Sequence, residues 1–280
     1  MISNKKNKVS KIDVLIQLFV KVKRDDIFAL ASQLAYYLVL SFFPFLIFLM
    51  TLIGFIGPDP LKVLEGTSRL LPTSVYELTE STIREVITSQ NTGLLGLSIL
   101  LAIWTASSGF RAVIKGINKA YNIKEERSFI KRTIISYLST IILAVTIIAT
   151  LLLLVFGDII KKYLNGILPF HNIIVVIWDI LRYGVIILAL VLVFAAIYRY
   201  TPSRKLKWKE VIPGAIVSAF GWIVLSFGFS YYINNFSNYS RFYGSLAAVF
   251  ILMIWLFLTS MVFIFGVELN SVLVLTKRSR

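Results

Sequence analysis

The sequence predicts an all-α, polytopic membrane protein with six transmembrane helices, amphipathic interfacial helices and both termini in the cytoplasm. Of its 280 residues, 58% are hydrophobic and 15% are charged, with a mean hydropathy of +0.82. Soluble domains are about 45–50% apolar and about 25% charged. Long uncharged runs recur along the chain, and a bilayer crossing needs roughly 20 apolar residues. Lys and Arg gather in alternate connections, which is the pattern of the positive-inside rule.

Residues 1–26 are predicted to be a cytoplasmic amphipathic segment. Lysines surround one apolar helical face, which consists of Val9, Ile12, Ile16, Phe19 and Val20. A basic amphipathic helix of this kind is typical of the anionic inner leaflet. The apolar run that follows is too long for the core of a cleavable signal peptide, so we expect none.

The transmembrane domain is predicted to cover residues 27–275, followed by a cytoplasmic tail at 276–280. Five uncharged runs identify five spans directly. Five spans alone would leave the basic C-terminus outside, and one crossing between Asp158 and Arg199 restores the alternation. The predicted spans are about 27–57, 93–112, 133–157, 175–198, 211–233 and 244–270.

The net charge of +15 follows from this topology. Twenty-two of the 29 Lys and Arg residues lie in segments assigned to the cytoplasm, namely 1–26, 111–132, 199–210 and the C-terminal tail. The positive-inside pattern accounts for that distribution without nucleic acid. We therefore predict membrane lipids as partners and no nucleic-acid partner, while the oligomeric state is left open.

Two further stretches are predicted to be helices in the membrane interface. Between the first two spans, Ser74 and Glu77 have the spacing of a capping box ahead of apolar residues. After the third span, a stripe is formed by Ile159, Ile160, Tyr163, Leu164 and Ile167. Each stripe suits packing against the bundle as well as contact with lipid.

Residues that carry catalysis are few and dispersed. The single histidine, His171, lies in an outer loop, and the pairs Asp25–Asp26 and Glu125–Glu126 adjoin basic residues at membrane boundaries. No metal-ligand spacing, phosphate-binding glycine loop or nucleophile elbow is present. Cysteine is absent, which excludes disulfides and thiolate metal sites. The prediction is a protein without enzymatic activity, catalytic residues, metal or cofactor.

Polar residues within the spans are more informative, because hydrocarbon accepts them only when they are paired. They gather in the cytoplasmic half of the first, second, fourth and sixth spans, and there we predict a substrate cavity. Its predicted lining is Gln33, Tyr37, Ser41, Ser107, Ser108, Arg111, Arg199 and Glu268. Arginine pairs bidentately with phosphate, so Arg111 and Arg199 suit an anionic head group, with Glu268 balancing one of them. The alternative is that these arginines mark helix ends and Glu268 is a structural partner.

Other residues of the spans are predicted to be structural. Pro44 frees a carbonyl and kinks the first span. Gly214, Ser218, Gly221 and Gly228 share one face of the fifth span and form a seam for close helix packing. Asp179 and Arg182 are spaced as an i,i+3 pair. The full predicted set is Pro44, Pro202, Gly214, Ser218, Gly221, Gly244, Asp179 and Arg182.

Three blocks of the chain resemble the YihY/BrkB family of bacterial inner-membrane proteins. They are ALASQLAYYLVLSFFPFLIFL from Ala29, SSGFRAVIKGINKAYNIKEERSFIKR from Ser107, and YRYTPSRKLKWKEVIPGAIVSAFGW with YGSLAAVFILMIWLFLTSMVFIFGVELNSVL. Matching the family's motif positions selects Tyr36, Ser41, Pro44, Arg111, Asn118, Pro202, Gly214, Tyr243, Gly244, Trp255, Gly266 and Glu268. The resemblance implies a six-helix protein of the cytoplasmic membrane.

The resemblance also brings two labels, a ribonuclease (ribonuclease BN) label regarded as a misassignment and a virulence-linked serum-resistance label. Our leading hypothesis is a transporter or flippase of an anionic lipid or lipid-linked envelope precursor, working by alternating access. The alternative is a non-catalytic membrane scaffold or envelope-assembly factor that binds partners through its basic loops. Ribonuclease activity is not expected, because the residues for it are missing.

Overall fold

The computed structural model describes residues 11–56, 59–65, 72–88, 92–167, 171–236 and 246–278. Over these ranges the chain is helical and contains no strand, which confirms the predicted all-α class. The helices are α1 (Lys11–Arg24), α2 (Ile27–Ile56), α3 (Pro60–Glu65), α4 (Thr73–Thr88), α5 (Thr92–Ala120), α6 (Phe129–Ile167), α7 (His171–Tyr200), α8 (Trp208–Phe236) and α10 (Ala247–Arg278).

Five helices within the described ranges are long and apolar enough to cross a membrane, namely α2, α6, α7, α8 and α10. The predicted second span coincides with α5, whose 29 residues would extend for about 43 Å at 1.5 Å per residue. The count of six spans and the cytoplasmic location of the termini stay predictions. Gly244 of the predicted sixth span lies outside the described residues, and α10 begins at Ala247.

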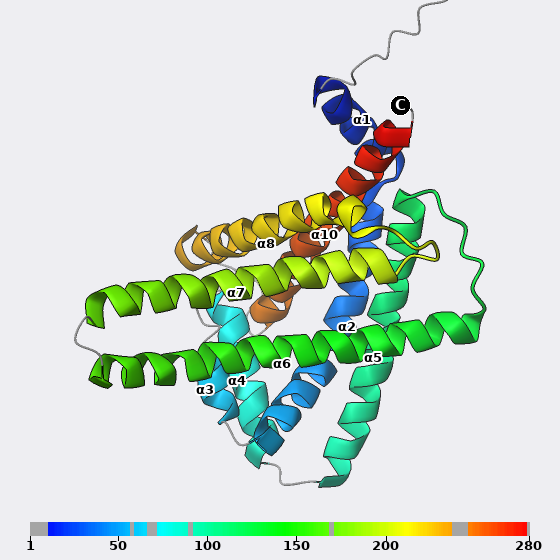
Figure 1. The fold of residues 1–280 in the computed structure, drawn as a ribbon. Coiled ribbons are helices and arrows are strands. Elements are labelled where there is room, and N and C mark those ends of the chain that lie inside the picture. The colour runs from blue at the N-terminus through cyan, green and yellow to red at the C-terminus, as the bar shows by residue number, and fades with distance from the viewer. Residues whose placement is uncertain are drawn as a thin grey trace, which may run out of the picture.

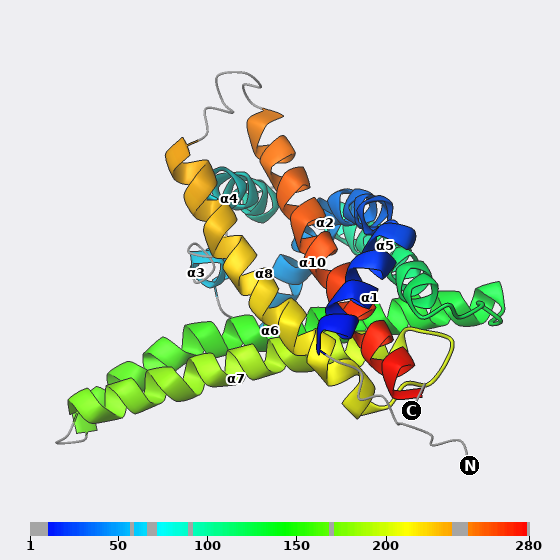
Figure 2. The same ribbon diagram turned by 90° about the horizontal axis from the view of Figure 1, so that it is seen from above.

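Two helix pairs and a central helix organise the bundle (Figures 1 and 2). The most extensive contact is between α2 and α5, and α10 packs against α8, α2, α1, α4 and α5. The helices α6 and α7 form an antiparallel pair whose connected ends project from the rest of the molecule. The end of α10 lies beside α1, so the first and last helices meet at one end of the bundle.

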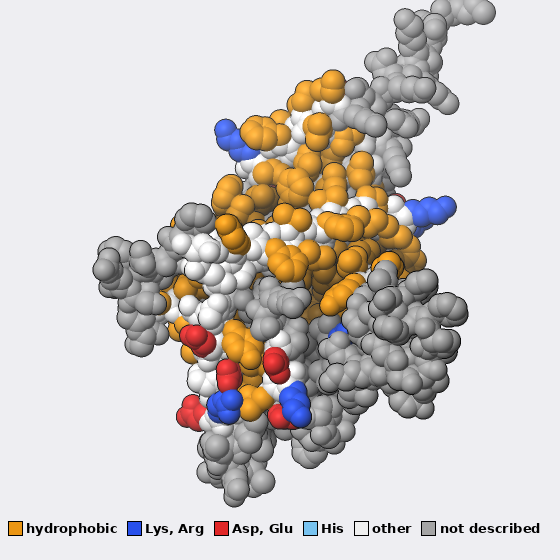
Figure 3. Space-filling model, turned by 90° about the vertical axis from the view of Figure 1, so that its left-hand side faces the viewer, with side chains coloured by type: hydrophobic (Ala, Val, Ile, Leu, Met, Phe, Trp, Pro, Cys, Tyr) orange, Lys and Arg blue, Asp and Glu red, His pale blue; other side chains and the backbone are white. Residues whose placement is uncertain are grey.

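The surface of the bundle is strongly apolar. Ile142 on α6 is 64% exposed and Val224 on α8 is 70% exposed. Figure 3 shows a broad band of hydrophobic side chains, with charged side chains at its edges and gathered at one end. Large contiguous apolar surfaces are rare on soluble monomers, and an apolar band between charged margins suits a bilayer.

Helix α1 exposes its apolar stripe and buries a charged residue on the opposite side. The apolar stripe points away from the protein, since Ile12, Ile16, Phe19 and Val20 are between 57% and 73% exposed. The opposite side of α1 packs against α10 and buries Leu18 and Lys21. The protein-facing side of this helix therefore includes a charged residue. Val9, at the start of the predicted stripe, lies outside the described residues.

The expected capping box at Ser74 and Glu77 is wrong. Helix α4 begins at Thr73, and the carbonyl of Pro72 accepts hydrogen bonds from the amides of Val75 (2.9 Å) and Tyr76 (3.0 Å). The Thr73 hydroxyl donates to Asn234 Oδ1 of α8 (2.9 Å). The start of α4 is therefore held by a contact with another helix. Ile83 of the apolar stripe is buried and packs against the bundle, whereas the side chains of Val86 and Ile87 lie outside the described part of the structure.

Two other local predictions change. The stripe at 159–167 is the last part of α6, which continues from Phe129 to Ile167 without a break. No proline interrupts this run, and the next one is Pro169. The short helix α3 was not predicted, although Asp59 accepts a hydrogen bond from the amide of Leu61 (3.0 Å) and Pro60 occupies the first helical position.

Candidate anion-binding pocket

A cavity of about 530 Å³ opens between α2, α5, the connection after α5 and the first turn of α6. Its lining consists of Gln33, Tyr37, Ser108, Arg111, Ala112, Ile114, Lys115, Asn118, Lys119, Ile123, Glu125 and Arg132. Four of these residues are cationic and one is acidic. The volume is within the range of small-molecule sites, which is about 300–1,000 Å³.

One face of α5 supplies three of the four cations. Arg111, Lys115 and Lys119 are spaced four residues apart, so they lie above one another on the helix, about 6 Å apart along its axis. Like charges at this spacing destabilise a helix by about 0.2–0.5 kcal/mol per pair. Folding alone therefore does not favour this row, and an anion would stabilise it.

Arg111 has hydroxyl partners and no carboxylate partner within the described part of the chain. Its Nη1 atom donates to Ser107 Oγ at 3.3 Å and its Nη2 atom donates to Ser108 Oγ. Both hydroxyls in turn donate to the carbonyl of Trp104, at 2.8 Å from Ser107 and 3.1 Å from Ser108. The serines orient the guanidinium and leave its charge uncompensated.

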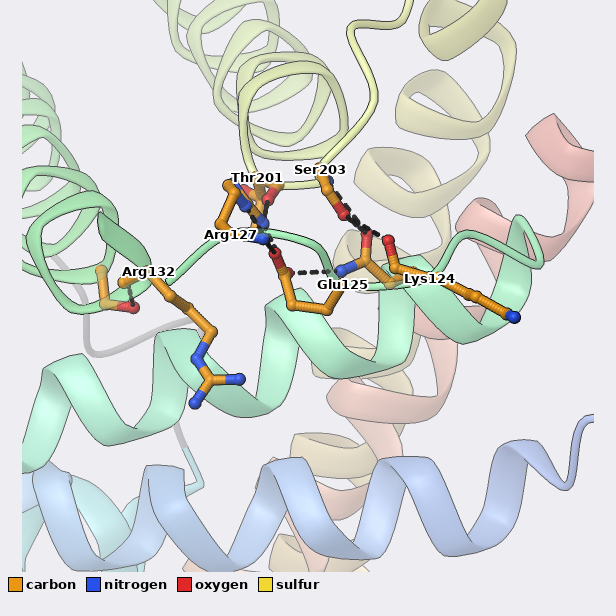
Figure 4. A network of polar contacts seen from close by, with 8 residues as sticks. Lys124, Glu125, Arg127, Arg132, Thr201 and Ser203 are labelled. Carbon is orange, nitrogen blue, oxygen red and sulfur yellow. Dashed lines mark hydrogen bonds and ion pairs between the residues drawn. The ribbon is translucent and has the colours of Figure 1, made fainter. Parts of the chain in front are cut away.

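Arg132 faces the same cavity from α6. Its Nε atom is buried and has no hydrogen-bond partner among the described residues. Its guanidinium carbon lies 5.7 Å from the centroid of the Phe129 ring, and Figure 4 shows the side chain extending away from the polar network beside it. A buried donor without an acceptor costs about 1–3 kcal/mol, so this arginine favours an incoming acceptor.

The one acidic residue of the lining does not neutralise these cations. Both Glu125 oxygens accept hydrogen bonds from Arg127, Oε1 from Nε and Oε2 from Nη2, each at 2.8 Å. Oε2 also accepts from Asn118 Nδ2 at 2.8 Å. The hydrogen bonds from Arg127 hold the pKa of Glu125 below its usual range, against the opposing effect of burial. Glu125 is therefore ionised and committed to Arg127.

Asn118 fixes this wall of the cavity to the connection between α7 and α8. Its Oδ1 atom accepts from the amide of Ser203 (3.1 Å) and from the Ser203 hydroxyl (3.3 Å). Its own carbonyl accepts from the amide of Ile123 at 2.8 Å. Arg127 donates to the carbonyl of Thr201 at 2.9 Å. Figure 4 shows these contacts as one network joining the two basic connections.

The structure brings together four of the eight predicted substrate residues, Gln33, Tyr37, Ser108 and Arg111. Ser107 is fully buried behind Arg111. Ser41 is buried and donates to the carbonyl of Leu38 at 3.1 Å, one turn beyond the cavity. The sequence missed Lys115, Lys119 and Arg132 as lining residues, although the four-residue spacing from Arg111 was a signal for the two lysines.

Arg199 and Glu268 lie elsewhere. The Arg199 guanidinium stacks over the ring of Trp208, 4.7 Å from its centroid, at the end of α7. Glu268 is fully buried and its Oε2 atom lies 2.9 Å from Lys21 Nζ of α1. The expected balance of Glu268 with Arg111 or Arg199 is therefore wrong, because α1 folds back onto α10 and supplies the cation.

The seam between α8 and α10 contains three of the residues predicted to be structural. A Cβ atom on Gly214 would lie 2.0 Å from the carbonyl oxygen of Gly266, and one on Gly221 would lie 2.9 Å from Val262. The Ser218 hydroxyl donates to the Val262 carbonyl at 3.0 Å. Close helix contact thus requires small residues here.

The other predicted structural residues are spread over the bundle. Helix α2 continues on both sides of Pro44. Pro202 and Arg182 are buried. The side chain of Asp179 is outside the described part of the structure, as is Gly244, so their predicted roles stay predictions. Within the described ranges, no three His, Asp or Glu residues are grouped closely enough to hold a metal ion.

Comparison with known proteins assigns the chain to a family. Residues 18–280 match the family model described as "Virulence factor BrkB". The chain is 38% identical over 243 residues to the ribonuclease-like protein YfkH of Bacillus subtilis, which covers 87% of this chain and 88% of YfkH. It is 24% identical over 281 residues to a UPF0761 membrane protein of Pseudoalteromonas atlantica, covering 94% of this chain and 87% of the relative. A UPF0761 membrane protein of Alteromonas mediterranea is 26% identical over 272 residues, covering 91% and 85%.

No solved structure matches the chain. The family match spans both the helix that carries Lys21 and the pocket helices α2, α5 and α6. Together with the apolar helices described above, it identifies the chain as a multi-pass bacterial membrane protein of the BrkB family.

Proposed function

We propose that this protein moves an anionic lipid or lipid-linked envelope precursor across the membrane by alternating access, and that the pocket receives the anionic head group. The observation that carries the proposal is the excess of positive charge in the cavity. Arg111, Lys115, Lys119 and Arg132 face it, and its one carboxylate is committed to Arg127. Arginine and lysine are the side chains that bind phosphate groups in proteins.

The surface beside the pocket supports an amphiphilic substrate. Tyr36 and Leu40 on α2 are 61% and 50% exposed, and Trp104 on α5 is 59% exposed. Trp104 lies one turn from Ser108 of the pocket lining, and Tyr36 adjoins Tyr37. A head group bound at Arg111 would leave its apolar chain along these exposed residues, which suit contact with lipid.

We further propose that the protein is not an enzyme and that the ribonuclease-like name of YfkH does not describe an activity of this chain. Hydrolysis of RNA needs a free acid or base, or a metal-bound water, next to the phosphate. The pocket carboxylate already accepts hydrogen bonds from Arg127 and Asn118. Purified protein with and without divalent cations is expected to leave RNA intact, and cleavage that depends on Glu125 would contradict this.

The transport proposal is tested in proteoliposomes that contain the purified full chain. A labelled phosphatidic acid and a labelled polyprenyl phosphate are placed in one leaflet, and their exposure to a membrane-impermeant quencher is followed over time. The protein should accelerate movement of at least one of these lipids, and Arg111→Gln and Arg132→Gln should slow it. Arg204→Gln is the matched control, because Arg204 is an exposed arginine of the α7–α8 connection that does not line the pocket.

Two results would contradict the proposal. One is an unchanged rate of lipid movement in the presence of wild-type protein across both lipids. The other is wild-type rates in both pocket variants. In either case the scaffold alternative gains, and partner proteins should then copurify equally well with wild-type protein and with Arg111→Gln.

A further inference from the structure

A second polar site lies outside the pocket, buried where α1 meets α10. Glu268 is fully buried, and Lys21 and Asp25 are each 5% exposed. Lys21 Nζ lies 2.9 Å from Glu268 Oε2 and 2.5 Å from Asp25 Oδ2, and it donates to the carbonyl of Ala120 at 2.5 Å. Two carboxylates therefore share one buried ammonium group.

The sharing is unequal. Asp25 has a second cation, because Arg24 Nε donates to its Oδ1 atom at 3.1 Å from the solvent side. Burial opposes ionisation of Asp25, but the hydrogen bonds from Arg24 and Lys21 together hold its pKa below the usual range. Glu268 has an ion pair with Lys21 alone, and neither of its two oxygens has a hydrogen-bond partner among the described residues. Glu268 is therefore the less well satisfied of the two carboxylates.

The neighbouring tyrosine does not satisfy the oxygens of Glu268. The Tyr121 hydroxyl, just after α5, is buried and has no hydrogen-bond partner among the described residues. Glu210 of α8 acts on Tyr121 together with Glu268, and both carboxylates, after burial itself, raise the pKa of this tyrosine. The charged groups that act on Glu268 are therefore the cations Lys21 and Arg24 and the carboxylate Asp25, all on α1 or directly after it.

We propose that Glu268 is a proton-binding site and that its proton controls the docking of α1 against α10. A buried carboxylate without hydrogen-bond donors is unfavourable in a low-dielectric interior, and a proton from water removes its charge. The added proton makes an O–H group and breaks only the ion contact with Lys21. Lys21 keeps Asp25, which directly follows α1, while α1 loses its charged contact with α10.

The site is linked to the helix that forms the pocket. Ala120 is the last residue of α5, and its carbonyl accepts hydrogen bonds from Lys21 and from Ser271 Oγ of α10 (2.7 Å). Loosening of α1 therefore releases one of two restraints on the end of α5. The proposal itself does not depend on transport, because proton binding and α1 docking are measured directly.

The chain contains no cysteine, so single cysteines report on α1 without background. Val22→Cys places a thiol on the side of α1 that packs against the core, and Leu15→Cys places one on its exposed side. The ratio of their maleimide labelling rates cancels the pH dependence of the thiol reaction. As the pH is lowered, this ratio should rise by at least about fivefold, the low end of typical couplings between linked sites.

Glu268→Gln should give the high ratio at every pH, while Glu126→Gln, an exposed control of the same type, should keep the wild-type step. Infrared spectra should show a protonated carboxyl band that appears with the step and is missing in Glu268→Gln. If that variant does not fold, the wild-type chain and Asp25→Asn carry the test, and both should retain the step and the band. A flat ratio in wild-type protein, or a step that persists in Glu268→Gln, would overturn the proposal.

Discussion

The seam between α8 and α10 and the pocket between α2, α5 and α6 differ in whether their polar groups find partners within the chain. In the seam, Asn270 accepts from the Gly214 amide at 2.6 Å and donates to the Val211 carbonyl at 2.9 Å. The Tyr198 hydroxyl lies 2.8 Å from Ser218 Oγ and donates to the Phe263 carbonyl at 2.8 Å. Each of these donors has an acceptor within the chain.

In the pocket the donors exceed the acceptors. Arg132 Nε has no partner among the described residues, and Lys115 and Lys119 extend the row that begins at Arg111. Buried polar groups that are satisfied within the chain hold helices together, whereas unsatisfied donors around a cavity favour an external acceptor. The contrast distinguishes structural from binding polar residues, and four changes would test it.

The largest effect is expected in the seam. Gly214→Ala places a methyl group 2.0 Å from the Gly266 carbonyl oxygen, where backbone cannot yield cheaply. We expect a loss of about 3 kcal/mol of stability or more, seen as a lower Tm of purified protein in detergent. Gly228 was also predicted to belong to the seam, but no atom lies within 4 Å of a Cβ added there, so the close contact does not reach it. Gly228→Ala is therefore the control, and the better helix propensity of alanine should leave Tm equal or higher. A normal Tm for Gly214→Ala would show that the seam is not close-packed.

The next effect is on binding. Arg111→Gln should weaken binding of a short-chain phosphatidic acid by about 10-fold to 100-fold, because a hydrogen bond to a charged group contributes about 1.5–3 kcal/mol. Titration calorimetry measures the affinity. Tm should stay near the wild-type value, in contrast to the seam variant, and Arg204→Gln should bind normally. Equal affinity in Arg111→Gln and wild-type protein would remove the pocket from the binding hypothesis.

Asn118 both holds two connections together and lines the pocket, so its loss should lower both stability and binding. Asn118→Ala removes the acceptor of the Ser203 amide and one donor to Glu125. We expect about 1–3 kcal/mol of destabilisation, together with weaker phosphatidic acid binding as the pocket wall loosens. Asn235→Ala, at an exposed asparagine of α8, should change Tm little. Full stability of Asn118→Ala would mean that the two basic connections are not held together by this residue.

The smallest effect is expected on the Tm at low pH when the Glu125–Arg127 pair is broken. Arg127 lowers the pKa of Glu125 from its ordinary value of 4.5, so the pair contributes stability above that value and loses it as pH falls through the lower folded value. Tm should therefore fall less steeply with acid in Arg127→Gln than in wild-type protein. The difference is expected to be small because water reaches the pair. Identical acid profiles would show that the pair is not formed.

The sequence predicted the helices better than the site, and physical reasons account for both. The first span was predicted at 27–57 and α2 covers Ile27–Ile56, because an uninterrupted apolar run defines its own ends. The second span was predicted to end at 112, because the row of cations that follows resembles a cytoplasmic loop. Helix α5 in fact continues to Ala120. Exclusion from lipid identifies a charged segment but does not distinguish a loop from a helix end.

Partners distant in the sequence could not be predicted. Glu268 was correctly singled out as a charge within a span, yet its cation is Lys21 on the first helix. Similarly, Arg132 lines the pocket only because the connection after α5 folds back through Asn118 and Ser203. A helical periodicity shows which residues share a face, while the choice of neighbouring helix depends on the packing of the whole bundle.

The hydrogen bonds on the Ala120 carbonyl have a consequence for biosynthesis. One donor, Lys21, is synthesised long before the other donor, Ser271, and before the counterion Glu268. Translation proceeds from the N-terminus, so Lys21 waits for its acidic partner until α10 is inserted. The packing of α1 against the bundle is therefore complete only when α10 has been inserted. In a nascent chain stopped before α10, we expect α1 to remain unattached to the bundle.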